Sequence, residues 1–456
     1  MTAAAAGTAG AAGGGAAAAL PEGRLEQRFA DYKPLYRPAE AEAEANRCLY
    51  CVDAPCIQAC PTEIDIPTFI RKIATGNVRG AARTILDANL LGYSCSRVCP
   101  VEVLCVGSCV YNAWERPPIQ IGRLQRYATE TVLAKGGIAG LYARRPATGK
   151  RVACVGGGPA SIAAAGLLAL AGHRVTVFER KQVPGGLNTL GIAPYKMLGD
   201  AALREIDWVL ALGEIELRTG VTVGEGDLSA ARLLADFDAV FLGLGLGADS
   251  TLGVPGEEGP GVHGAVALIE RIKADPTLDL GGARTALVVG GGNTAIDIAH
   301  ELALLDLDDV AMVYRRREAD MSGYAHELDY ARRHGVRLLE DRVPLAVLRD
   351  GQGRVTGLRV ARAQGGKPVA GSEHDLPCDL IAVAIGQARA TGLAQAFPGV
   401  ALDPKGRVVV DPVTRRTGHP KVWAGGDCVN GGKEVVNAAQ DAKLAARSID
   451  ALLRGA

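Results

Sequence analysis

Apolar positions beyond residue 150 follow the order of a strand, a glycine turn and a helix. Arg151–Val155 is a short apolar run, glycines interrupt it, and an Ala- and Leu-rich stretch then continues to Ala171. Arg174–Phe178 is a second run of strand length. Because strands joined by a crossover helix lie parallel, this order predicts a βαβ unit. The same order recurs at Thr285–Val289, the glycines 290–292, a helix to about Leu305 and Val310–Tyr314.

The region from Leu20 to about Lys135 has a different pattern, helical and rich in loops. Within it, residues 66–91 carry apolar side chains at helical spacing, interrupted by Gly76-Asn77. We therefore expect two short helices there. Residues 1–19 are almost entirely Ala and Gly, which predicts a disordered tail.

Size and composition limit the class of protein. A chain of 456 residues is long enough for two or three domains. Fifty acidic and fifty basic residues give no net charge, so the sum favours neither nucleic acid nor an anionic membrane as a partner. No apolar stretch approaches the roughly 20 residues of a membrane span. The 59 glycines and the aromatic content of 4% favour an α/β protein with many tight turns.

Eight of the eleven cysteines lie between Cys48 and Cys109. They form two runs, C-x2-C-x4-C-x3-C-P from residue 48 and C-x3-C-P-x4-C-x3-C from residue 95. This spacing is typical of iron–sulfur ligands, and eight thiols suffice for two 4Fe-4S clusters. The alternatives are a structural zinc site, for which only Cys48 and Cys51 form the usual pair, and disulfides, which suit small secreted proteins. With reduced thiolates and no export signal, we expect a cytoplasmic protein.

Each predicted βαβ unit carries a turn suited to a dinucleotide. The first has Gly156-Gly157-Gly158-Pro159-Ala160-Ser161 between strand and helix, and Glu179 ends its second strand. Such glycines let the backbone approach a pyrophosphate, the helix N-terminus binds the charge, and the carboxylate accepts hydrogen bonds from ribose. The second turn is Gly290-Gly291-Gly292-Asn293-Thr294-Ala295. The alternative is two glycine turns without a nucleotide.

Where the second unit would carry an acidic ribose ligand it has Arg315, Arg316 and Arg317. Guanidinium groups suit a 2′-phosphate, which favours NADPH over NADH. The alternative is an ordinary solvated surface.

A third element lies near the C-terminus, where the strand-like Val422–Ala424 leads into Gly425-Gly426-Asp427. Glu434–Ala438 then opens the last helix. An Asp at a strand end can bind the ribityl chain of a flavin, and a helix N-terminus stabilises negative charge on the reduced ring. We therefore expect an α/β protein with a helical iron–sulfur domain at 20–135 and two Rossmann-like, three-layer domains. The FAD-binding domain would comprise 150–282 and 387–456, with the NAD(P)H-binding domain, 283–386, inserted in it.

Five phrases resemble a known family: Asn46-Arg47-Cys48, Asp53-Ala54-Pro55-Cys56, Leu91-Gly92, Ile121-Gly122-Arg123-Leu124-Gln125 and Pro184-Gly185-Gly186-Leu187. From about Asn46 onward the chain is similar to the flavin and iron–sulfur electron-entry family, which includes the small subunits of bacterial dihydropyrimidine dehydrogenase and of glutamate synthase. The second and fourth phrases resemble the dihydropyrimidine branch more closely. Residues 316–321 and 370–374 resemble the glutamate synthase branch.

The resemblance to the dihydropyrimidine branch implies two ligand sets for the clusters. One is Cys48, Cys51, Cys56 and Cys109, and the other is Cys60, Cys99, Cys105 and Gln125. Cysteine spacing alone would choose Cys95 in place of Gln125, so both remain candidates for the last ligand.

The resemblance also implies the cofactor-binding residues. FAD would contact Gly156, Gly158, Pro159, Ala160, Ser161, Glu179, Gly186, Leu187, Lys196, Val221, Gly426, Asp427 and Val435. NADPH, or NADH, would contact Gly292, Asn293, Thr294, Ala295, Arg315, Arg316 and the turn Ala384-Ile385-Gly386. Lys196 stands where the family has a phosphate-binding Arg, and it keeps the charge but loses the bidentate fork. Ser322 replaces a further family Arg, which weakens the case for selection of the 2′-phosphate.

By the same resemblance, the chain is expected to pass electrons from NAD(P)H through FAD and the clusters to an FMN-containing catalytic subunit. A dihydropyrimidine dehydrogenase-type complex is the first candidate, and glutamate synthase or another reductase the second. A stand-alone disulfide or ferredoxin reductase would want a C-x2-C pair near the flavin, but Cys154, Cys378 and Cys428 are isolated. A redox sensor using the clusters alone would leave both nucleotide units without a role.

Overall fold

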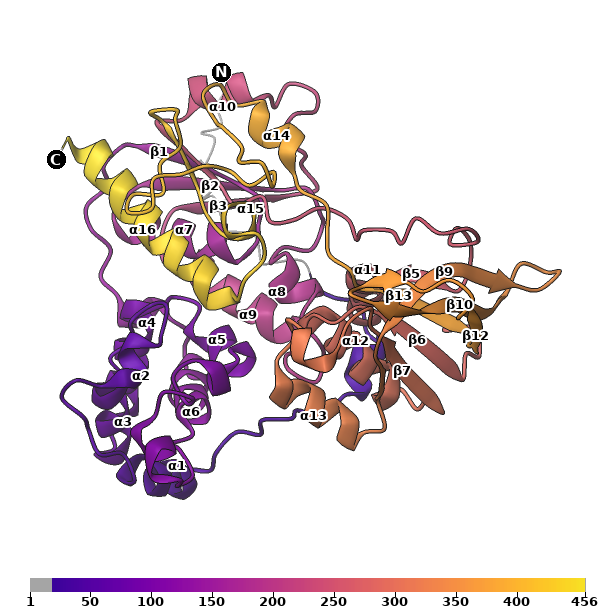
Figure 1. Cartoon of the computed structure of the whole chain (residues 1–456). Helices are drawn as coiled ribbons and strands as arrows, with labels where there is room; N and C mark the ends of the chain where they lie inside the picture. Colours follow the sequence, from indigo (N-terminus) through magenta and orange to yellow (C-terminus); the bar gives the residue numbers. More distant parts are fainter. Residues whose placement is uncertain (1–18, 456) are drawn as a thin grey trace, which may run out of the picture.

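A computed structural model describes residues 19–455, which form a helical N-terminal region, two parallel sheets and one antiparallel sheet (Figure 1). Apart from Ala19, the predicted Ala/Gly tail lies outside the described residues. No helix in this part of the chain is both long and apolar enough to cross a membrane.

Short helices build the N-terminal region, and the two expected between residues 66 and 91 are confirmed. Gly76, with φ of +76°, follows the first of them, and the Asn77 side chain caps the second by accepting a hydrogen bond from Gly80 N at 2.8 Å. The elements are η1 (Leu25–Arg28), α1 (Pro38–Asn46), α2 (Pro55–Gln58), α3 (Ile66–Ala74), α4 (Val78–Ala88), α5 (Gly92–Val98), η2 (Val101–Val103), η3 (Val110–Trp114), α6 (Ile121–Leu133) and η4 (Ala139–Leu141).

The first parallel sheet has the strand order β14-β4-β1-β2-β3. Its strands are β1 (Arg151–Val155), β2 (Arg174–Glu179), β3 (Ile215–Thr219), β4 (Ala239–Leu242) and β14 (Val422–Ala424), and its helices are α7 (Pro159–Leu170), α8 (Leu187–Leu190), α9 (Gly199–Leu210), α10 (Ala230–Asp236), α14 (Thr391–Gln395), α15 (Asp427–Asn430) and α16 (Val435–Arg454). Because β14 comes from near the C-terminus and pairs with β4, the second sheet is inserted before the first is complete.

The second parallel sheet has the order β5-β13-β6-β7-β8. Its elements are β5 (Val262–Gly264), α11 (Ala265–Ala274), β6 (Thr285–Val289), α12 (Asn293–Leu304), β7 (Asp309–Val313), η5 (Glu318–Asp320), α13 (Ala325–Arg333), β8 (Arg337–Leu339) and β13 (Leu380–Val383). The expectation of two Rossmann-like parallel sheets is thus confirmed. Strand β5 joins the edge of this sheet although it precedes residue 283, the expected start of the inserted domain.

An antiparallel sheet, which the sequence pattern did not predict, covers one face of the second parallel sheet. It comprises β9 (Arg342–Arg349), β10 (Val355–Gln364), β11 (Lys367–Pro368) and β12 (His374–Pro377). Leu358 and Val360 of β10 are fully buried in one apolar cluster with Ile381 of β13. Helices α11, α12 and α13 share a separate cluster with the parallel sheet, so the third layer of this domain is a sheet.

Candidate functional site

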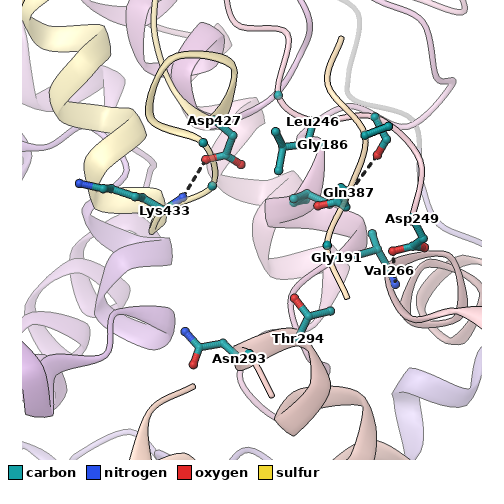
Figure 2. A pocket seen from close by; sticks show the side chains of 18 of the residues that line it. Gly186, Gly191, Leu246, Asp249, Val266, Asn293, Thr294, Gln387, Asp427 and Lys433 are labelled. Carbon is teal, nitrogen blue, oxygen red and sulfur yellow. Dashed lines mark hydrogen bonds between the residues drawn. The ribbon is translucent and has the colours of Figure 1, made fainter. Parts of the chain in front are cut away.

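A cavity of about 2020 Å³ is lined by residues of both parallel-sheet domains. Figure 2 shows Gly186 and Asp427 of the first domain across from Asn293 and Thr294 of the second. Ligands of open α/β sheets bind beyond the carboxyl ends of the strands, and both glycine turns lie at that edge. The cavity is therefore the candidate site for both nucleotides.

In each of the two glycine turns, the backbone passes close to a carbonyl oxygen at the end of a neighbouring strand. A side chain at Gly156 (φ +92°) would bring its Cβ to 2.4 Å from the carbonyl oxygen of Gly243, which follows β4. At Gly290 (φ +150°) the Cβ would lie 2.3 Å from the carbonyl oxygen of Ala384, which follows β13. Only glycine fits there, so each turn stays tight and each helix begins at the cavity.

The first turn fits a pyrophosphate. Open space surrounds Gly158, where a Cβ would meet nothing within 4 Å, and helix α7 begins at the next residue. The Ser161 hydroxyl in the first turn of α7 is buried without a hydrogen-bond partner among the described residues but does not line the cavity, so the donors at the cavity are the backbone N–H groups at the start of α7. Free donors at a helix N-terminus are what a bound phosphate requires.

Glu179 at the end of β2 lines the cavity and also holds the first turn in place. Its carboxylate accepts hydrogen bonds from Gly157 N at 2.6 Å and from Lys181 N at 2.7 Å. The ribose-binding group predicted from the sequence is thus already oriented by the backbone.

The third predicted element also faces the cavity. Asp427 accepts a hydrogen bond from Lys433 N at 3.1 Å (Figure 2), and burial raises the pKa of its carboxyl group. Helix α16 begins at Val435, which lines the cavity, and continues for 20 residues. Its N-terminus therefore directs a positive dipole end toward the space available for a flavin.

The second turn places Asn293 and Thr294 on the cavity wall together with Arg315 and Arg316. Asn293 accepts a hydrogen bond from Tyr324 N at 2.9 Å. Arg317 instead forms an ion pair with Asp341 at 2.6 Å. Two of the three predicted arginines are thus available to a nucleotide phosphate.

Lys196 lines the cavity but has two carboxylate partners in the inserted domain. Its ammonium lies 2.8 Å from Asp297 and 2.7 Å from Glu327. Burial alone would lower the pKa of Lys196, but the two carboxylates outweigh it and raise the pKa. Burial, followed by the charge of Asp297, raises the pKa of Glu327 to about 7.

The first cysteine set surrounds its own small cavity. Cys48, Cys51, Cys56 and Cys109 all line it. Burial, followed by the charges of Cys48 and Cys109, raises the pKa of Cys56 to about 12. These thiols come from segments more than 50 positions apart, and none is in a disulfide. Four thiols that form no disulfide fit a cubane 4Fe-4S cluster, which binds each thiolate through a different iron.

The second set lies against the nucleotide cavity. Pro61, Val98 and Leu104 line that cavity, and each is the chain neighbour of Cys60, Cys99 or Cys105. A hydrogen bond with Cys95 and burial raise the pKa of Cys99, and the charges of Cys105 and Cys60 raise it further. Among the described residues, no three His, Cys, Asp or Glu side chains converge on a single metal ion.

Gln125 and Cys95 are both buried, and Cys95 forms a hydrogen bond with Cys99 of this second set. Gln125 Nε2 donates to the carbonyl of Gly92 at 2.8 Å, and Cys95 Sγ accepts from Asn89 Nδ2 at 3.2 Å. No hydrogen bond to the amide oxygen of Gln125 is found among residues 19–455. Both residues therefore stay candidates, and the assignment of Gln125 stays a prediction.

Nearly all predicted cofactor residues lie on the wall of the large cavity; only Ser161 and Ala295 do not, because both are fully buried within their helices. The residues that sequence reasoning missed include Asn188, Leu244, Gly245, Asp249, Asp297, Tyr324, Glu327, Gln387 and Arg389. A signal was present for the loop after β4, where Gly243-Leu244-Gly245-Leu246-Gly247 follows an apolar run. No local signal marks Asp297 or Glu327.

Two family models match the chain. One, described as dihydropyrimidine dehydrogenase domain II, 4Fe-4S cluster, matches residues 25–137. The other, pyridine nucleotide-disulphide oxidoreductase, matches residues 150–442.

Curated relatives match over almost the whole chain. The chain is 33% identical over 455 residues to the glutamate synthase (NADPH) small chain of Escherichia coli K12, covering 94% of this chain and 95% of that protein. It is 34% identical over 433 residues to the NAD-dependent dihydropyrimidine dehydrogenase subunit PreT of the same organism, covering 94% and 99%.

Solved structures are similar in fold. Thioredoxin reductase from T. acidophilum aligns with a TM-score of 0.52 and 22% identity over 66% of this chain and 98% of that chain. Mycobacterium tuberculosis FprA, solved in complex with NADPH, aligns with a TM-score of 0.52 and 21% identity over 68% of this chain and 86% of that chain.

Proposed function

Since the chain belongs to the pyridine nucleotide-disulphide oxidoreductase family and carries the 4Fe-4S domain of dihydropyrimidine dehydrogenase, we propose that it is the electron-input subunit of a larger enzyme. The chain is an oxidoreductase whose cofactors are FAD, NAD(P)H and 4Fe-4S clusters. Its partner would be an FMN-containing subunit that binds the substrate.

One observation carries this proposal. The cavity that holds both glycine turns shares its wall with the neighbours of Cys60, Cys99 and Cys105. The other cysteine set has a separate cavity, and Leu49 and Val52 beside it are 47% and 97% exposed. The nucleotide cavity, the inner cysteine set (Cys60, Cys99 and Cys105) and the outer cysteine set (Cys48, Cys51, Cys56 and Cys109) thus follow one another toward the surface.

Bound FAD would accept a hydride from the nicotinamide and release electrons one at a time to the clusters. The residues of this chain bind and orient these groups. Arg315 and Arg316 would hold the 2′-phosphate of NADPH, Glu179 the flavin nucleotide ribose, and the N-terminus of α16 would stabilise negative charge at the flavin ring.

The described residues support the need for a partner. The two parallel sheets have five strands each and the antiparallel sheet has four, so none resembles an eight-stranded substrate barrel. We propose a dihydropyrimidine dehydrogenase-type complex, supported by the phrase Ile121–Gln125. Glutamate synthase is the second candidate, supported by residues 316–321 and by the 33% identity to its small chain.

The test begins with the isolated chain, purified without oxygen. It should carry FAD and about eight irons, and should oxidise NADPH or NADH with a dye as acceptor. It should reduce neither uracil nor 2-oxoglutarate plus glutamine, until an FMN-containing partner is added. Zinc in place of iron would contradict the cluster proposal, and substrate turnover by the chain alone would contradict the subunit proposal.

A matched pair of variants tests whether the electrons pass through the outer cluster, the one at Cys48, Cys51, Cys56 and Cys109. Cys51→Ser removes a proposed ligand of the outer cluster, so it should abolish partner-coupled substrate reduction and spare much of the dye reduction. Cys378→Ser, which changes a buried thiol of the inserted domain, should spare both. Equal coupled activity in the two variants would place the outer thiols off the electron path.

A further inference from the structure

Three lysines are buried among the described residues, and one of them has no carboxylate partner. Lys196 pairs with Asp297 and Glu327, and Lys273 with Glu26 at 3.5 Å. Lys443 is 8% exposed, and no ion pair to an Asp or Glu is found for it in residues 19–455. A buried ammonium needs a nearby negative charge, because burial without one costs several kcal/mol.

The contacts of Lys443 lead to the inner cysteine set. Its Nζ donates to the carbonyl of Thr62 at 2.7 Å and to the carbonyl of Ala88 at 3.2 Å. The Thr62 hydroxyl in turn lies 3.4 Å from Cys60 Sγ. Ala88 is the last residue of α4, so the ammonium also meets the negative end of that helix.

The charges that act on Lys443 come from the segment around Cys60 and from its own helix, α16. Burial lowers the pKa of the Lys443 ammonium and the charge of Arg447 lowers it further, whereas Glu63 and Cys60 oppose this shift. Arg447 lies one turn further along α16 and is exposed. Glu63 is exposed and Cys60 is buried, so the candidate for the missing buried anion is the thiolate of Cys60 and the cluster that it would bind.

Helix α16 connects this lysine to the flavin site. Val435 at the start of α16 lines the nucleotide cavity, and Lys443 follows eight positions later. At 1.5 Å per residue, the two are about 12 Å apart along the axis. Figure 1 shows the α16 ribbon beginning near α5 of the N-terminal region and running away from it to the C-terminus, and α16 contacts α5.

We propose that Lys443 raises the reduction potential of the cluster at Cys60, Cys99 and Cys105, and so favours electron transfer from the flavin to that cluster. The proposal rests on the proposed function, since it needs the cluster to be present. Reduction adds one negative charge to the cluster, and a fixed positive charge held by Thr62 and Ala88 stabilises the reduced form. Lys443 acts through Thr62 and Cys60 and does not bind the cluster itself, so it is a positioning residue.

The experiment is a potentiometric titration of the purified protein with both clusters followed by electron paramagnetic resonance. Lys443→Gln keeps a hydrogen-bond donor but removes the charge, and should shift the one-electron equilibrium of one cluster about tenfold toward oxidation, ~59 mV. Lys443→Arg keeps the charge and should hold the wild-type potential. Arg447→Gln, which removes an exposed charge from the same helix, should leave both clusters unchanged.

Three results would overturn the proposal: an unchanged potential in Lys443→Gln, an equal shift of both clusters, or the same shift in Arg447→Gln. If Lys443→Gln loses the inner cluster while Lys443→Arg keeps it, the need for charge is supported. Loss of the cluster in both variants would show that the site tolerates no replacement and would overturn a role of charge. A wild-type protein without clusters would instead refute the proposed function.

Discussion

The ammonium of Lys196 lies 2.8 Å from the carboxylate of Asp297, joining the loop after α8 to helix α12 of the inserted domain. The side chains are only 7% and 12% exposed. Glu327 completes the group from α13. Lys196 thus links the two nucleotide domains at the cavity wall, and its predicted contact with FAD remains to be tested.

Replacing Lys196 by Met should destabilise the protein by about 3 to 5 kcal/mol, because two buried carboxylates would lose their counter-charge. Chemical denaturation followed by circular dichroism measures this loss in the free energy of unfolding. Lys150→Met is the control, since Lys150 and Asp238 form a partly exposed pair 3.3 Å apart that should contribute no more than about 1 kcal/mol. Equal losses of stability in both variants would contradict the conclusion that Lys196 neutralises two buried carboxylates.

Glu205 of α9 should make stability depend on pH. Its buried carboxyl group accepts hydrogen bonds from Ser94 Oγ and from Tyr93 N at 3.0 Å, at the start of α5. Burial raises the pKa of Glu205 to about 7 from 4.5, although these hydrogen bonds oppose the shift. The folded protein therefore keeps a proton that the unfolded chain has lost, and this stabilisation disappears as pH rises from about 4.5 through 7.

The measurement compares wild type with Glu205→Gln by urea denaturation at several pH values. The amide mimics the protonated acid, so the wild type should lose up to about 3 kcal/mol relative to the variant across that window. Parallel pH profiles for the two proteins would show that Glu205 does not titrate there.

Gln125→Ala should damage one cluster, whereas Cys95→Ser should leave both intact. The serine hydroxyl can still accept the hydrogen bond that Asn89 donates to Cys95, and the resemblance makes Gln125 the ligand. Electron paramagnetic resonance of the reduced variants decides between them. A cluster lost in the Cys95 variant and kept in the Gln125 variant would reverse the assignment.

Arg315→Ala combined with Arg316→Ala should weaken NADPH binding more than NADH binding. Each charge-assisted phosphate contact is worth roughly 1.5 to 3 kcal/mol, or at least about tenfold in Kd. Arg317→Ala is the control, because its guanidinium pairs with Asp341 and should affect both nucleotides equally. Equal losses of both nucleotides in the double variant would mean that these arginines are only solvated surface.

Local sequence order determined the two βαβ units. The strands expected at Arg151–Val155 and Thr285–Val289 have those bounds in the structure, since a short apolar run before a glycine turn has few other ways to bury its side chains. The direct succession of strand, glycine turn and helix is a local motif, so it indicated the nucleotide site from the sequence alone. The cysteine spacing likewise indicated clusters before any fold was known.

Tertiary structure alone decided which distant residues meet. Lys196 contacts residues more than 100 positions away, and Lys443 reaches a carbonyl 381 positions earlier in the chain. The antiparallel sheet over β13 and the cavity wall shared with the inner cysteines depend in the same way on packing between segments far apart. Local periodicity reports only which side of an element is buried; the partner on that side is chosen by burial and charge compensation over the whole chain.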